Sequence, residues 1–146
     1  MGRIIGIDYG TKRIGLAVTD PLGIFASPLN TVSPKEFDNF IQKYLKTEKI
    51  DAFVIGYPVQ MNNQPSETVN YINPFIKKLK KIFPEKDIHL VDERFTSQIA
   101  LRTVIDGGVK KRDRQDKSLI DKISASIILQ SFLDNRSNKK ENNRSI

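Results

Sequence analysis

Short apolar runs and helically spaced apolar positions alternate along this chain. In residues 3–9 the isoleucines are almost consecutive, which is typical of a strand covered on both faces. Glycine-containing turns follow the first two runs, so we expect antiparallel hairpins there. Pro28 interrupts the third run, which favours a sheet edge or a bulge. The strands are predicted over residues 3–9, 13–19, 24–32, 51–57 and 87–92.

Four further segments have the features of helices. Ser33 is a suitable N-cap, with Pro34 at the first helical position, and apolar positions recur at helical spacing from Phe37 to Leu45. The remaining helices are expected from Ser66 to about Phe83, over residues 97–106, and from about Ser118 to Leu133. This order predicts an α/β fold with a mixed five-stranded sheet, three antiparallel strands followed by parallel ones, and helices on both faces.

The length of 146 residues suits one domain, expected over residues 1–133. Residues 134–146 are polar and unpatterned, so the sequence predicts a disordered C-terminal tail. No apolar run approaches the roughly 20 residues that span a bilayer, and the N-terminus lacks the features of a signal peptide. We therefore expect a cytoplasmic protein without a membrane partner.

The composition narrows the chemistry. There are 24 Lys and Arg against 17 Asp and Glu, a net charge of +7, which favours an anionic partner such as nucleic acid. A generically basic small protein is the alternative interpretation. The chain has no cysteine and a single histidine, His89, which excludes thiol nucleophiles, thiolate metal sites and multi-histidine zinc sites.

Three carboxylates stand where a metal site would need them. Asp8 lies on the most apolar strand, where an ionised group requires a cation or hydrogen-bond donors. Only one acid of the Asp92-Glu93 pair can share a face with Asp8, because neighbouring strand residues point to opposite faces. Asp121 lies near the start of the last helix, beside the small residues at 124 and 125 that permit close packing. Taken singly, these acids also suit a turn, a surface ion pair and a helix-dipole partner, respectively.

Taken together, three such carboxylates indicate two divalent ions roughly 4 Å apart, as in phosphodiester hydrolysis. Hard oxygen ligands suit Mg²⁺ or Mn²⁺. Like charges this close would not all stay ionised without cations, so the sequence predicts metal dependence.

Four blocks of sequence in order resemble the YqgF (RuvX) family, from about Arg3 to Leu133. The blocks are IGIDYGTKRIGLAVTD, VIGYPVQMN, DERFTS and SLIDKISASIILQSFL. The resemblance implies a ribonuclease H-like fold and a nuclease that matures the 5′ end of precursor 16S ribosomal RNA. An older description of the family is Holliday junction resolvase.

The resemblance also implies roles for individual residues. It assigns catalysis and metal binding to Asp8, Glu93 and Asp121, with Asp8 shared by both ions. Thr11, Lys12 and Arg13 would belong to the loop beside the metals, and Arg94 and Thr96 to the same edge. The chain departs from the family at Asn62, where the family usually has an acid, and at Ser124, where it usually has alanine.

The sequence thus predicts a metal-dependent endonuclease acting on structured precursor rRNA, as a monomer or weak homodimer. Phosphate contacts are expected from a basic cluster that comprises Lys12, Arg13, Arg94, Lys110, Lys111, Arg112 and Arg114.

Three alternatives stay open. A resolvase of branched DNA would need a stable dimer for two symmetric cuts. An RNA-binding scaffold without activity would have no reason to retain three acids. The DYGT turn also resembles the phosphate-binding hairpin of actin-like and sugar-kinase proteins, but those proteins clamp nucleotide between two such domains, and this chain supplies one.

Overall fold

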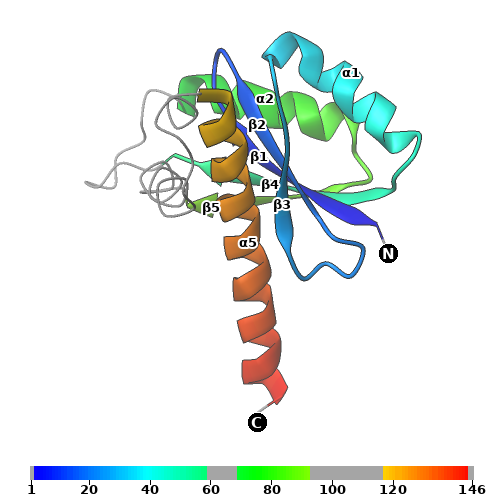
Figure 1. Cartoon of the computed structure of the whole chain (residues 1–146), viewed down its shortest axis with the longest axis vertical. Coiled ribbons are helices and arrows are strands. Elements are labelled where there is room, and N and C mark those ends of the chain that lie inside the picture. Colours follow the sequence, from blue (N-terminus) through cyan, green and yellow to red (C-terminus); the bar gives the residue numbers. More distant parts are fainter. Residues whose placement is uncertain (1, 59–68, 93–116, 145–146) are drawn as a thin grey trace.

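A five-stranded sheet in the order β3-β2-β1-β4-β5 forms the centre of the molecule (Figure 1). The computed structural model describes residues 2–58, 69–92 and 117–144, and the side chains of those residues as far as 136. β1 pairs antiparallel with β2 and parallel with β4, which in turn pairs parallel with β5. The strands are β1 (Arg3–Tyr9), β2 (Ile14–Thr19), β3 (Ala26–Val32), β4 (Ile50–Tyr57) and β5 (Asp87–Asp92). This is the mixed sheet that the sequence predicts.

The third strand confirms the interpretation of Pro28. β3 pairs only with β2 in the described sheet and is therefore an edge strand, where a missing N–H is tolerated. Its register shifts where Leu16 pairs with Asn30 and Ala17 pairs with Pro28, so Leu29 is passed over. Both an edge position and an irregularity thus accommodate the proline.

Two helices cover one face of the sheet and a third covers the other. α1 (Pro34–Leu45) and α2 (Val69–Ile82) enclose one core, in which Phe37, Phe53 and Ile72 are almost fully buried. α5 (Lys117–Arg144) crosses the opposite face, where Leu129 packs with Val54 and Ala17. Because successive residues of a strand point to opposite faces, one strand contributes side chains to both cores, and β1 therefore carries apolar residues on both faces.

The start of α1 follows the predicted capping arrangement. Ser33 has an extended backbone, and its side-chain oxygen accepts a hydrogen bond from the Glu36 N–H at 3.3 Å. Pro34 occupies the first turn, where its missing N–H costs nothing.

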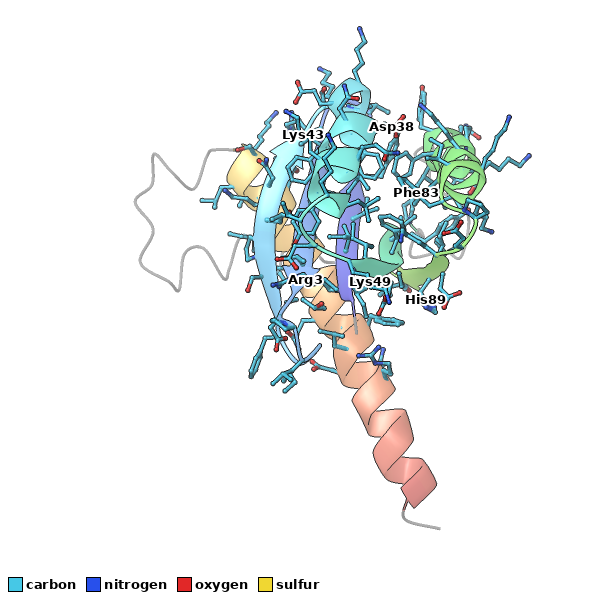
Figure 2. The ribbon with its side chains drawn as sticks, turned by 90° about the vertical axis from the view of Figure 1, so that its right-hand side faces the viewer. Arg3, Asp38, Lys43, Lys49, Phe83 and His89 are labelled. Carbon is cyan, nitrogen blue, oxygen red and sulfur yellow. The ribbon has the colours of Figure 1, made fainter. Side chains whose placement is uncertain are left out.

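The end of the last helix differs from the prediction. α5 runs to Arg144, so the boundary expected near Leu133 is wrong, and residues 134–144 continue the helix in place of a disordered tail. No glycine or proline follows Leu133 to end it. Gln130 donates to the Asp134 carboxylate at 3.0 Å, and the Arg136 guanidinium lies 5.6 Å from the centre of the Phe132 ring. These contacts continue the helix past the sheet, beyond which its last turns project (Figure 2).

α5 approaches the sheet closely because glycines face it. A Cβ at Gly6 would lie 2.7 Å from Leu129 Cβ and 2.9 Å from the Ala125 carbonyl oxygen. A Cβ at Gly15 would overlap the backbone carbonyl of Asp121. Ala125 is fully buried, as the small residues predicted at this turn require.

Two hydrogen bonds fix the direction of α5 across the sheet. Thr31 Oγ1 donates to the Ser118 carbonyl at 2.6 Å, at the start of the helix. The Ala26 N–H donates to Gln130 Oε1 at 2.8 Å, three turns later. Both partners are on β3, so this edge strand holds the helix at two points.

Two predictions concern residues that the structure does not describe, namely the helix start at Ser66 and the helix over residues 97–106. No helix in the described part of the chain is long and apolar enough to cross a membrane.

The glycine contact predicts that Gly15→Ala destabilises the fold. The added methyl group meets backbone atoms, which cannot rotate away as a side chain can, so either α5 or β2 must shift. We expect the free energy of unfolding to fall by about 1–3 kcal/mol in urea denaturation. Leu22→Ala is the control, because Leu22 is 72% exposed. If the urea midpoint of Gly15→Ala equalled that of Leu22→Ala, the close packing of α5 against Gly15 would be contradicted.

The turn after β2 predicts a pH-dependent contribution to stability. The Asp20 carboxylate accepts hydrogen bonds from the N–H groups of Leu22, Ile24 and Phe25, and these bonds lower its pKa in the folded chain. Its contribution is therefore complete above the unfolded pKa of about 4 and declines as pH falls through the lower folded value. In thermal unfolding, Asp20→Ala should lower Tm most at neutral pH and less at pH 2. A difference in Tm that grows toward pH 2 would contradict this assignment.

Candidate metal centre

The carboxyl ends of three parallel strands meet at one edge of the sheet. β1, β4 and β5 run in the same direction and end at Tyr9, Tyr57 and Asp92. Ligands of open α/β sheets bind at this edge. Asp8 is the next-to-last residue of the central strand.

Strand alternation directs Asp8 to the face that α5 covers. Ile4 belongs to the core beneath α5, and Gly6 lies against Leu129 and Ala125. Ile5 and Ile7 belong to the opposite core. Asp8 has the same parity as Ile4 and Gly6, and it is partly buried.

Asp121 reaches the same region from the helix. Gly15 is the residue on β2 that pairs with Asp8, and the backbone of Asp121 lies directly against Gly15. Asp8 and Asp121 are therefore both adjacent to Gly15, on the same face of the sheet. The sequence predicts this meeting from the small residues of α5, but the glycine that receives the helix is not among the predicted site residues.

The Asp121 carboxylate has a cationic partner. Arg13 Nε donates to Asp121 Oδ2 at 2.6 Å, with the side chains 39% and 22% exposed. The two residues are 108 positions apart in the sequence. From the sequence, Arg13 is expected beside the metals as a phosphate ligand, and no local pattern indicates its ion pair with Asp121.

The donors fit a hard divalent cation. Asp8 and Asp121 both offer carboxylate oxygens, which Mg²⁺ and Mn²⁺ prefer. The guanidinium on Asp121 shows that positive charge is already accommodated there. Within the described ranges, no group of three or more His, Asp or Glu side chains forms a metal-binding cluster. The third predicted ligand, Glu93, lies outside those ranges.

Ser124 follows Asp121 by one turn and is buried, at 1% exposure. Its Oγ has no hydrogen-bond partner among the described residues. A buried hydroxyl without a partner lowers the stability of the fold.

The predicted nucleic-acid contacts are only partly described. Lys12 is exposed in the turn between β1 and β2, beside Arg13. Outside the described residues lie Arg94, Thr96, Lys110, Lys111, Arg112, Arg114 and Asn62.

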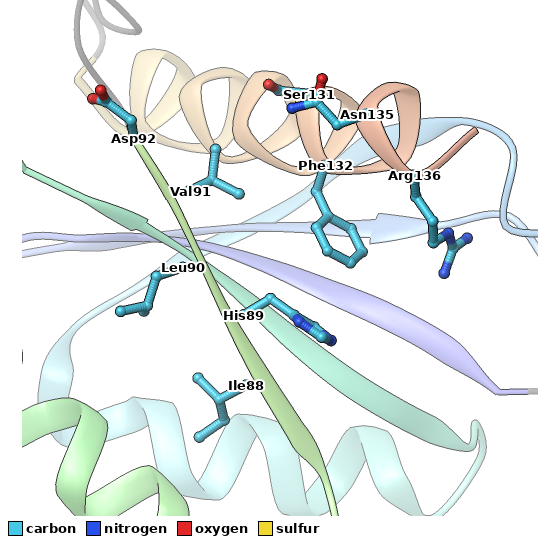
Figure 3. A pocket seen from close by; sticks show the side chains of 9 residues that line it. All are labelled: Ile88, His89, Leu90, Val91, Asp92, Ser131, Phe132, Asn135 and Arg136. Carbon is cyan, nitrogen blue, oxygen red and sulfur yellow. The ribbon is translucent and has the colours of Figure 1, made fainter. Parts of the chain in front are cut away.

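An open pocket of about 800 Å³ lies away from the two carboxylates, between β5 and the later turns of α5 (Figure 3). The rings of His89 and Phe132 contact each other across it, with their centres 4.8 Å apart and their planes tilted by 31°. Asp92 lines one end, whereas neither Asp8 nor Asp121 takes part. His89 and Val91 point toward α5, and Ile88 and Leu90 point away from it. This alternation shows which residues of β5 share the face of Asp8.

Comparisons with known proteins agree on one family. The family model RuvX, described as "Holliday junction resolvase", matches residues 2–135. A Bacteroides thetaiotaomicron protein named "Putative pre-16S rRNA nuclease" is 51% identical over 136 residues, covering 93% of this chain and 99% of its own length. A Porphyromonas gingivalis protein of the same name is also 51% identical, covering 92% and 98%.

Two solved structures share the fold. The Fowlpox virus resolvase, in complex with Holliday junction DNA, aligns with a TM-score of 0.54 and 12% identity over 91% of this chain and 97% of its own. RuvC of T. thermophilus, also with a Holliday junction, aligns with a TM-score of 0.52 and 18% identity over 94% and 96%. The predicted ribonuclease H-like fold is confirmed.

The ion pair predicts a measurable coupling between Arg13 and Asp121 in metal-free protein. A double-mutant cycle of Arg13→Gln and Asp121→Asn should give about 0.5–1 kcal/mol in urea denaturation, because the pair is short but partly exposed. The coupling should decrease in 1 M salt. The more exposed pair Lys78–Asp38, at 3.2 Å, is the control and should give less. Equal coupling energies for the two pairs would count against a structural role for the Arg13 contact.

Proposed function

Because the chain belongs to the RuvX family, we propose that it is a nuclease that processes the 5′ end of precursor 16S ribosomal RNA with divalent metal ions. Two relatives that are 51% identical to this chain are named for a nuclease of this kind, and this chain aligns with almost their whole length. The observation that carries the proposal is the meeting of Asp8 and Asp121 at Gly15, on one face of the sheet. Because the proposed activity is the processing of precursor rRNA, we expect this protein to act in the cytoplasm.

We assign Glu93 as the third carboxylate. His89 and Val91 point toward α5, whereas Asp92 has the parity of Leu90, which points away from it. Asp92 is therefore not on the face of Asp8, and the neighbouring acid in the sequence is Glu93. Asp8, Glu93 and Asp121 together form an all-oxygen ligand set for Mg²⁺ or Mn²⁺, as a two-ion site requires.

The divalent ions supply, when bound, the Lewis acidity that activates water and stabilises the departing oxygen. The chain's own residues hold the ions and place the phosphate. Arg13 contacts Asp121, and Lys12 is the exposed residue before it; in this proposal both offset the negative charge of the scissile phosphate. His89 contacts Phe132 on the far part of α5, so the histidine is not assigned a role in proton transfer.

A basic surface beside the metals would hold the RNA backbone. The residues proposed for it, besides Lys12 and Arg13, are Arg94, Lys110, Lys111, Arg112 and Arg114. Each phosphate that these side chains neutralise adds about 0.7–0.9 to the slope of log affinity against log salt. The expected oligomeric state is a monomer or a weak homodimer.

Branched DNA is the second candidate substrate. The family model is described as a Holliday junction resolvase, and the two solved structures named above, which share its fold, are bound to such junctions. Symmetric cleavage of a four-way junction requires two sites related by a two-fold axis. A substrate comparison therefore has to include this DNA.

The proposed site predicts that Asp8→Asn abolishes cleavage but retains binding. With Mn²⁺ or Mg²⁺, the wild-type protein should cut a precursor 16S rRNA 5′-leader fragment, and the variant should be slower by about a hundredfold or more, because it loses a metal-binding charge. RNA binding by the variant, measured with the same protein preparation but without metal, should persist, and it should weaken as the salt concentration rises.

Asp51→Asn is the matched control for charge. Asp51 is an acid of the same sheet, but it lies at the amino end of β4, where its carboxylate accepts a hydrogen bond from the Gly2 N–H and pairs with Lys49. Its substitution should leave cleavage within about twofold of wild type. Binding of RNA without cleavage by any of these proteins would favour the inactive scaffold. Cleavage of the four-way junction alone would establish the resolvase.

A further inference from the structure

The ion pair between Arg13 and Asp121 places a guanidinium on an oxygen that the proposed function assigns to a metal ion. The donor is Nε and the acceptor is Oδ2, at 2.6 Å. A charge-assisted hydrogen bond of this length, on a carboxylate that is 22% exposed, is a substantial interaction. Any cation that binds Asp121 must compete with it or accommodate it.

The position of Arg13 in the fold keeps the guanidinium at this site. Arg13 directly precedes β2, and it has the same strand parity as Gly15, the residue that touches the Asp121 backbone. Gly15 pairs with Asp8 on the neighbouring strand. The guanidinium therefore enters from the sheet side at the point where the two candidate metal ligands meet.

We propose that Arg13 is the resident counter-ion of Asp121 in the metal-free protein, and that it moves to a substrate phosphate when a divalent cation binds. This inference rests on the proposed function, because it takes Asp121 as a metal ligand. A carboxylate has one negative charge, which cannot fully offset a guanidinium and a divalent ion together. Binding of the metal therefore weakens the hold of Asp121 on Arg13.

The released side chain has a partner that matches its chemistry. A guanidinium binds phosphate oxygens through two parallel N–H donors, a geometry that lysine cannot reproduce. Arg13 is 39% exposed, so its end is accessible from solvent. The exchange couples metal and substrate: each makes the other bind better, because each removes a cost imposed by the Arg13–Asp121 pair.

The test is a calorimetric titration of the free protein with Mn²⁺, without nucleic acid. Arg13→Gln removes the competing cation, so Mn²⁺ should bind about fivefold more tightly or better. Arg13→Lys keeps a competing charge and should bind Mn²⁺ with a Kd closer to that of wild type. Lys78→Gln is the charge control, since it removes one positive charge from an exposed residue of α2, on the opposite face of the sheet, and it should change the Kd by less than about twofold.

The second measurement is cleavage at saturating Mn²⁺. Arg13→Gln should lower kcat/KM for the RNA about tenfold to a hundredfold, because the phosphate loses its guanidinium. Arg13→Lys should recover only part of the loss, since lysine binds phosphate as a point charge. Thermal unfolding of each variant verifies that it is folded.

The outcomes separate the exchange from the metal site itself. An unchanged or weaker Mn²⁺ affinity in Arg13→Gln, with wild-type binding lost in Asp8→Asn, overturns the exchange and leaves the metal site standing. Arg13 would then orient Asp121 for the metal. If the wild-type protein binds no Mn²⁺, the proposed metal site and the exchange both fail.

Discussion

The contact of the α5 backbone with two glycines of the sheet is the constraint on which the rest of the structure depends. Gly15 lies against the carbonyl of Asp121, and Gly6 lies against Ala125 and Leu129. Side chains at these positions would hold the helix farther away, because β-carbons meet backbone atoms there. The same contact closes the second core and brings a helical acid to the end of β1. The packing of α5 and the geometry of the candidate site thus both depend on the contact between α5 and the two glycines.

Electrostatics then determine how two acids on one face are tolerated. Asp8 and Asp121 both adjoin Gly15, and the guanidinium of Arg13 offsets the charge of Asp121. The chain as a whole has a net charge of +7, so this acidic spot belongs to a basic protein. Such a combination suits an enzyme that must attract a polyanion and also hold cations beside its phosphate.

Local signals in the sequence predict most of the fold. The Ser33-Pro34 cap, the edge position of Pro28 and the apolar runs of β1, β4 and β5 are all local features, and the structure confirms them. The end of α5 is the clear error. A polar segment without apolar periodicity resembles a disordered tail, but no glycine or proline breaks the helix after Leu133, and adding residues to a helix that already exists costs less than starting a new one.

By itself, the sequence determined the fold class and the family and predicted three acids for the site, because periodicity, capping and an ordered set of motifs all lie within short stretches of chain. Only the tertiary structure decided which groups meet. Arg13 and Asp121 are 108 residues apart, and Gly15 faces the helix only because β2 pairs with β1 in one register. Contacts of this kind follow from how the layers pack, which no local pattern of residues records.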